Sequence, residues 1–150
     1  MRIDLTGRQA LVTGSSQGIG LAIATGLARA GAAAVLTARD PGKLAAAADR
    51  LRADVDGAEV STVAADVVTD EGTTTLLEAV PDVDALVNNL GIFGATPALE
   101  ITDDAWRRYF ETNVLTGVRL TRAYLPGMRD RGWGGSSTSP ATRRSPSRPR

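Results

Sequence analysis

The stretch QALVTGSSQGIGLAIATGLARAG, residues 9–31, decides the fold. Residues 9–14 form a short apolar run that ends in glycine, which is typical of a buried strand. A glycine-rich turn follows, and after it apolar residues recur at helical spacing until Gly31, which predicts a helix that ends there. A strand, a glycine turn and a helix in this order predict the first unit of a parallel α/β sheet.

The same alternation continues along the chain. Apolar runs predict three further strands, at residues 33–39, 58–66 and 83–89. Helical patterns lie between and after them, at residues 41–54, 69–80 and 102–132, the last of them in two pieces. Because crossovers between parallel strands are right-handed, we expect a doubly wound α/β sheet with strand order 3-2-1-4.

Composition excludes several kinds of chemistry. The 150 residues fit one domain, and 43% hydrophobic content suffices for a core. The sequence has no cysteine and no histidine, which excludes disulfides, zinc–thiolate sites and a histidine base, and we expect no metal site. No apolar run is long enough to cross a membrane, and the first residues lack the apolar core of a signal peptide. We therefore expect a cytoplasmic protein.

Charge gives no sign of a polyanionic partner. The formal net charge is zero, with 17 basic and 17 acidic residues. Four arginines lie in the final stretch, so the rest of the chain is mildly acidic. We expect neither a nucleic-acid nor a membrane partner, although those arginines leave open an arm that attracts RNA or membranes.

The glycine turn TGSSQGIG, residues 13–20, has a specific physical use. Gly14 permits a tight turn, Gly18 lets the backbone approach a pyrophosphate, and Gly20 lets the helix pack close to the strand. The N-terminus of the following helix offers free N–H groups to phosphates. The turn therefore predicts a dinucleotide site, and the alternative is a packing turn without a ligand.

Four motifs in order carry a family resemblance. They are the Thr-Gly-x-x-x-Gly-x-Gly turn, AADV at 64–67, NNLG at 88–91 and TNV at 112–114. Together they resemble the short-chain dehydrogenase/reductase family over residues 7–131. The resemblance implies an NAD(P)-dependent oxidoreductase of small alcohol or carbonyl substrates, with a partial Rossmann-type domain at residues 1–131. It also implies pairing of subunits through long helices, and it leaves the substrate and the oligomeric state open.

The resemblance assigns roles to individual residues. Asp66 would accept a hydrogen bond from the adenine amino group beside Val67, and Asn113 would hold a water or a main-chain kink in a proton relay. Asp66 capping a turn and Asn113 capping a helix break are the alternatives. The residues expected along the phosphates, ribose and nicotinamide are Gly14, Ser15, Ser16, Gln17, Gly18, Ile19, Gly20, Asn89 and Gly91. Leu90 stands where the family has alanine and would narrow the cleft.

The end of the second strand bears on the choice of cofactor. An acid there would bind the ribose 2′-hydroxyl of NAD, but the matching residue is Ala38, followed by Arg39. An arginine can pair with a 2′-phosphate through two parallel hydrogen bonds, which favours NADP over NAD. Gln17, where NADP-binding relatives often carry a basic residue, argues the other way, and a solvated Arg39 without a ligand is the alternative.

The family's catalytic serine and Tyr-x-x-x-Lys pair have no counterpart here. The tyrosines, Tyr109 and Tyr124, are followed four residues later by Asn113 and Met128. The only lysine, Lys43, is expected on the second helix, far from the site. We therefore expect a chain that keeps dinucleotide binding but is inactive as an enzyme. The alternative is a noncatalytic dinucleotide-binding or interaction module.

The final stretch, GWGGSSTSPATRRSPSRPR at residues 132–150, lacks any apolar pattern and is predicted to be a disordered tail. In a gene rich in G and C, its codons read one base later can encode an apolar strand ending in serine. Our hypothesis is therefore a truncation or frameshift near Gly134, and the alternative is a genuine basic tail. Either way we expect the fourth strand to be an unpaired sheet edge and the chain to be marginally stable.

Overall fold

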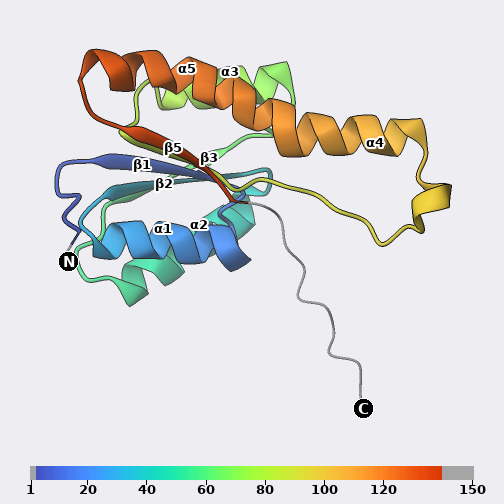
Figure 1. Ribbon diagram of the computed structural model, residues 1–150. Coiled ribbons are helices and arrows are strands. Elements are labelled where there is room, and N and C mark those ends of the chain that lie inside the picture. Colours follow the sequence, from blue (N-terminus) through green and yellow to red (C-terminus); the bar gives the residue numbers. More distant parts are fainter. Residues whose placement is uncertain (1–2, 140–150) are drawn as a thin grey trace.

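The computed structural model describes residues 3–139, and they form a parallel sheet with helices on both faces (Figure 1). The strand order is β3-β2-β1-β4-β5. The strands are β1 (Gln9–Thr13), β2 (Ala33–Ala38), β3 (Val60–Ala64), β4 (Ala85–Asn88) and β5 (Gly135–Thr138). The helices are α1 (Gly18–Arg29), α2 (Pro41–Asp54), α3 (Asp70–Ala79), α4 (Asp103–Phe110) and α5 (Thr116–Asp130).

Two apolar clusters sandwich the sheet. Figure 1 shows α1 and α2 on one face and α3 and α5 on the other. Neighbouring side chains of β1 belong to opposite clusters, since successive strand residues point to opposite faces of the sheet: Leu11 packs against α3 and α5, and Val12 packs against α1 and α2. A buried row at every fourth position holds α5 on the sheet: Thr116, Leu120, Tyr124 and Met128. No helix of the described residues is long and apolar enough to cross a membrane.

The doubly wound sheet and the order of its first four strands confirm the sequence prediction. The fifth strand contradicts the prediction, because β5 lies within the stretch 132–150, which was predicted to be disordered. Residues 140–150 of that stretch lie outside the described residues. The expectation that β4 is an unpaired edge is also wrong, since β5 pairs with it from Ala85↔Gly135 to Asn88↔Thr138.

Backbone pairing explains how a stretch without apolar side chains forms a strand. All four side-chain positions of β5 are exposed, so its pairing depends on the unpaired backbone groups that the edge of β4 offers. The connection from α5 is also anchored, because Arg131 pairs with Asp82 at 2.8 Å and Trp133 stacks under the Arg8 guanidinium at 4.0 Å. These contacts involve residues before the strand, so the sequence of residues 135–138 alone does not predict them.

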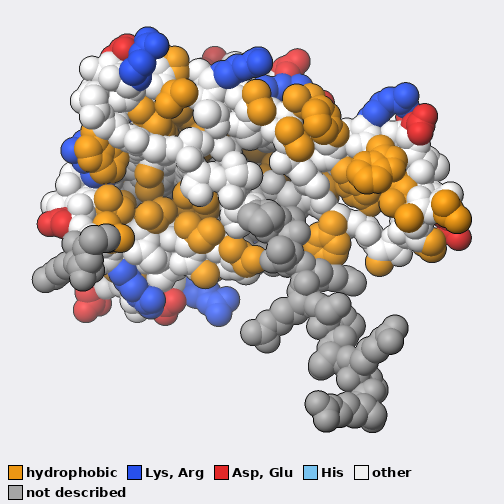
Figure 2. All heavy atoms as spheres, in the orientation of Figure 1, with side chains coloured by type: hydrophobic (Ala, Val, Ile, Leu, Met, Phe, Trp, Pro, Cys, Tyr) orange, Lys and Arg blue, Asp and Glu red, His pale blue; other side chains and the backbone are white. Residues whose placement is uncertain are grey.

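The last long helix runs in two pieces, as predicted. Thr102 caps α4 by accepting a hydrogen bond from the Ala105 N–H at 3.2 Å. A π-helical turn, Glu111–Leu115, then joins α4 to α5. The outward face of this helix carries exposed large apolar side chains, among them Trp106, Phe110, Val114 and Val118. Figure 2 shows apolar side chains gathered over α4 and α5.

We predict that Gly26→Ala in α1 raises the free energy of unfolding. Gly26 is an exposed helix-interior residue, and a methyl group there meets no heavy atom within 4 Å. Alanine loses less backbone entropy than glycine when the helix folds, so urea unfolding should show a free energy of unfolding that is higher by about 0.5–1 kcal/mol. Gly20→Ala, in the same helix, should destabilise the chain because its methyl group collides with the Gly14 carbonyl. Equal effects of the two substitutions would contradict this packing.

Candidate functional site

The glycine turn at the carboxyl end of β1 has the geometry that the sequence predicts. Gly14 and Gly18 have φ angles of 62° and 59°, in the left-handed region that favours glycine. An added methyl group on Gly20 would collide with the Gly14 carbonyl and the Asn89 amide. The start of α1 therefore lies against the end of β1, with its first N–H groups at the turn.

Hydrogen bonds between Thr13 and the residues after β4 hold this turn. The Asn89 Nδ2 group donates to the carbonyls of Thr13 and Gly14, at 3.1 and 3.2 Å. The Thr13 Oγ1 atom accepts from the N–H groups of Asn89 and Leu90, both at 3.0 Å. We call these four bonds the Thr13–Asn89 clasp. The Asn89 side chain thus fixes the turn, and its predicted contact with the ribose or nicotinamide stays a prediction.

Ser15 has a structural role of the same kind. It is fully buried, its Oγ donates to the Val12 carbonyl at 2.7 Å, and the same oxygen accepts from the Thr37 N–H at 3.0 Å. This hydroxyl joins β1 to β2 beneath the turn. Gln17, by contrast, is exposed at the N-cap of α1 and makes no capping hydrogen bond with its side chain.

A cavity of about 200 Å³ opens beside the turn, at the carboxyl ends of the strands. We call it the turn pocket. Six of its lining residues are predicted cofactor residues: Gly14, Ser16, Gln17, Arg39, Asp66 and Val67. The other predicted cofactor residues do not line this pocket. Gly18, Ile19 and Gly20 begin α1, and Gly91 lies in the loop after β4.

The Asp66 turn forms the wall of the pocket on the β3 side. The Asp66 carbonyl accepts from the Thr69 N–H at 3.0 Å, and its Oδ1 accepts from the Val68 N–H at 3.2 Å. Gly72 of α3 packs so close that an added methyl group would collide with the Asp66 backbone. Asp66 therefore both caps a turn and lines the turn pocket, so the two sequence interpretations of this residue are compatible.

Thr37 and Lys43 also line the turn pocket, and sequence reasoning missed both. Thr37 is 1% exposed, and its Oγ1 has no hydrogen-bond partner among the described residues. A buried hydroxyl without a partner is uncommon in folded proteins, and a water or a polar ligand group at the pocket would satisfy it. Lys43 lies in the first turn of α2 and lines this pocket, whereas the expectation that it lies far from the catalytic site stays a prediction.

Asn113 holds the loop that follows β4. Its Oδ1 accepts from the Ile92 N–H at 2.8 Å, and its Nδ2 donates to the Ile92 carbonyl at 2.9 Å. Asn113 lies within the π-helical turn, a local irregularity that often marks functional sites. The structure thus gives Asn113 a main-chain anchoring role, and its part in a proton relay stays a prediction.

Neither tyrosine lies at the turn pocket. Tyr124 is 2% exposed and donates its hydroxyl hydrogen to the Val80 carbonyl at 2.8 Å. Burial, together with the negative charge of Asp82, raises the pKa of Tyr124 to about 12. Tyr109 packs edge-on against Trp106, with ring centroids 6.4 Å apart. Tyr124 is therefore a core residue whose proton is already engaged.

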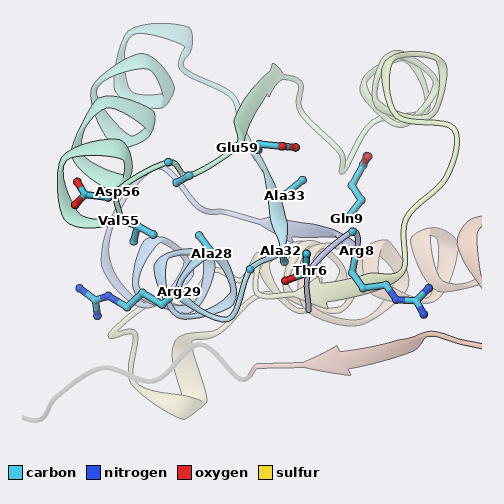
Figure 3. A pocket seen from close by; sticks show the side chains of 14 residues that line it. Thr6, Arg8, Gln9, Ala28, Arg29, Ala32, Ala33, Val55, Asp56 and Glu59 are labelled. Atoms are coloured by element: carbon cyan, nitrogen blue, oxygen red, sulfur yellow. The ribbon is translucent and has the colours of Figure 1, made fainter. Parts of the chain in front are cut away.

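A larger hollow lies at the opposite end of the sheet and does not form a comparable site. Its volume is about 530 Å³, and its lining includes Arg8, Arg29, Asp56 and Glu59. Figure 3 shows the Arg8 and Arg29 side chains pointing away from each other, out of the hollow. Binding sites need polar groups that converge on a ligand, so the turn pocket is the better candidate.

Comparison with known proteins gives a consistent result. A family model described as short chain dehydrogenase matches residues 8–136. The uncharacterized oxidoreductase YvaG of Bacillus subtilis is 47% identical over 128 residues, which are 85% of this chain and 48% of that protein. A 1-deoxy-11-beta-hydroxypentalenate dehydrogenase of Streptomyces arenae is 36% identical over 131 residues, 83% of this chain and 46% of that protein.

Solved structures show the same relation. L-sorbose reductase from Gluconobacter frateurii, complexed with NADPH and L-sorbose, aligns with a TM-score of 0.83 and 41% identity over 92% of this chain and 54% of that one. A 3-oxoacyl (acyl-carrier-protein) reductase from Agrobacterium tumefaciens C58 with NADP bound aligns with a TM-score of 0.82 and 36% identity over 91% of this chain and 54% of that one. The chain thus spans about half the length of the relatives it matches.

We predict that Tyr124 makes stability depend on pH in the alkaline range. Its pKa is about 12 in the folded chain and 10.0 as the ordinary value, so the folded state holds this proton more tightly. The resulting stabilisation is complete below pH 10 and is lost as the pH rises to 12. Urea unfolding at several pH values should show this loss in the native chain and in Tyr109→Phe, and a smaller loss in Tyr124→Phe. Identical profiles for all three would contradict the assignment.

Proposed function

Because the chain belongs to the short chain dehydrogenase family, we propose that its turn pocket binds the adenosine end of a nicotinamide dinucleotide, with NADP preferred to NAD. We further propose that the chain keeps this binding without turning over the small alcohol or carbonyl substrates of its family, because the sequence offers no counterpart of the catalytic serine and Tyr-x-x-x-Lys pair. The observation that carries the proposal is the turn pocket. It is lined by residues of the glycine turn, the end of β2 and the Asp66 turn, all at the carboxyl ends of the strands. Ligand pockets commonly exceed about 300 Å³, so this cavity suits one end of a dinucleotide.

The residues present suit the parts of such a cofactor. The N-terminus of α1 would bind the phosphates, because its first N–H groups lack helical partners and the glycine turn lets them approach. The Asp66 carboxylate would accept from the adenine amino group. The Thr37 hydroxyl, buried without a partner among the described residues, would gain one from the bound ribose or adenine.

The preference for NADP depends on charge at the end of β2. Ala38 and Arg39 both line the pocket, so the strand ends without a carboxylate for the 2′-hydroxyl of NAD. The neighbouring Asp40 caps α2, since its Oδ1 accepts from the Lys43 N–H at 3.0 Å. The NADPH in the sorbose reductase and the NADP in the Agrobacterium reductase support the same choice.

The chain's own residues account for binding and positioning rather than for proton transfer. A bound nicotinamide dinucleotide supplies the hydride donor or acceptor in such a reaction. Asn113 orients the loop after β4 through its two bonds to Ile92, and the Thr13–Asn89 clasp fixes the phosphate turn. Tyr124 is buried with its hydroxyl engaged, so it is not the proton donor.

We predict that the chain binds NADPH about tenfold or more tightly than NADH, as measured by isothermal titration. Arg39→Ala should remove most of this difference in affinity, because it loses a charge-assisted pair with the 2′-phosphate and so weakens the binding of NADPH but not of NADH. Arg50→Ala is the matched control, an exposed arginine of α2 that does not line the pocket. Equal binding of both nucleotides to the native chain would contradict the NADP preference, and binding of neither would contradict the proposed function.

A further inference from the structure

We propose that Lys43 is a second specificity-determining residue, whose ammonium group binds the 2′-phosphate of NADP together with the Arg39 guanidinium. This inference rests on the proposed function of the turn pocket and goes beyond it, because it assigns a role to a residue that the motifs leave out. A 2′-phosphate carries close to two negative charges, so one arginine alone leaves part of that charge unpaired.

The fold brings the two cations to one wall of the pocket. Arg39 directly follows the last residue of β2, and Lys43 is the third residue of α2. Only Asp40 and the first two residues of the helix lie between them, and both side chains line the turn pocket. Both residues are exposed, so their long side chains can adjust to a ligand without losing buried contacts.

The acids nearby do not cancel this charge where the ribose would lie. The carboxylates that line the pocket are Asp40 and Asp66. Asp40 faces the N-terminus of α2, where its Oδ1 accepts from the Lys43 N–H, and Asp66 lies across the pocket beyond the end of β3. The first turn of α2 contains no further acid, and the Asp40 carboxylate at its N-cap offsets the partial positive charge of the helix N-terminus, so the positive charge on this wall comes from the Arg39 and Lys43 side chains.

Lys43 has no structural use that competes with this role. Its ammonium group makes no ion pair or side-chain hydrogen bond within the part of the chain that the structure describes. The salt bridge within α2 joins Arg52 and Asp49 instead. A charged side chain that is unpaired and lines a pocket with a second cation fits an anionic ligand group.

Two probes isolate the 2′-phosphate without any need for catalysis. Adenosine 2′,5′-bisphosphate and adenosine 5′-monophosphate differ only in that group. We expect the full chain to bind the bisphosphate at least tenfold more tightly in isothermal titration. Lys43→Gln should weaken binding of the bisphosphate about fivefold to tenfold and leave binding of the monophosphate unchanged. Lys43→Arg should keep the preference for the bisphosphate. Arg50→Gln should bind both probes as the native chain does.

Chemical labelling tests the same contact in the native chain, whether or not the variants fold. Lys43 is the only lysine of the sequence, so reductive methylation followed by mass spectrometry of its peptide reports on one ε-amino group. The bisphosphate at saturation should slow methylation of Lys43 at least threefold, and the monophosphate at saturation should not.

The outcomes separate the two proposals. If neither probe binds, the proposed function of the turn pocket fails and this inference fails with it. If both probes bind but Lys43→Gln weakens them equally or not at all, or if the bisphosphate leaves Lys43 methylation unchanged, the role of Lys43 is wrong and the dinucleotide site stands.

Discussion

The Thr13–Asn89 clasp is the constraint on which the rest of the candidate site depends. It ties the end of β1 to the residues after β4, through four hydrogen bonds between 3.0 and 3.2 Å. The Gly14 carbonyl is one of its acceptors, so the clasp also orients the first peptide of the glycine turn. Because Gly20 then packs against the same carbonyl and amide, the position of α1 follows from the clasp. The clasp thereby also positions the first N–H groups of α1, which we propose to bind the phosphates.

The sequence predicts the first four strands well because their signals are local. Buried parallel strands appear as apolar runs, and the turn after β1 needs glycine at Gly14 and Gly18, where φ is positive. β5 has no such signal. Its residues, Gly-Ser-Ser-Thr, form a strand because β4 offers a free edge and because Arg131 and Trp133 anchor the connection before it. Tertiary pairing of this kind overrides the weak strand propensity of the segment.

The candidate site was predictable in outline but not in its division of roles. Arg39 and Asp66 follow strand ends, where ligands bind in such sheets, and both line the turn pocket. Ser15 and Asn89 are predicted ligand-binding residues whose side chains hold backbone in the structure, and their contact with a ligand stays a prediction. A hydroxyl or amide can do either, and only the surrounding carbonyls and N–H groups decide.

The residues that sequence reasoning missed had misleading contexts. Thr37 lies inside an apolar strand, so the sequence gives no reason to single out its hydroxyl. Only the structure shows that this hydroxyl is buried and has no hydrogen-bond partner among the described residues. Lys43 reads as a solvent-facing residue of an ordinary amphipathic helix. Its proposed role rests on the short stretch of chain between Arg39 and the start of α2, which places both cations at one pocket.

Amide hydrogen exchange of the full chain, with and without saturating NADP, tests most directly whether the preformed turn is the binding site. The account predicts slower exchange in residues 13–20, 37–43 and 64–69, which surround the turn pocket. It predicts no change in residues 55–59, which line the larger hollow at the opposite end of the sheet. Protection confined to residues 55–59, or absent from residues 13–20, would contradict it.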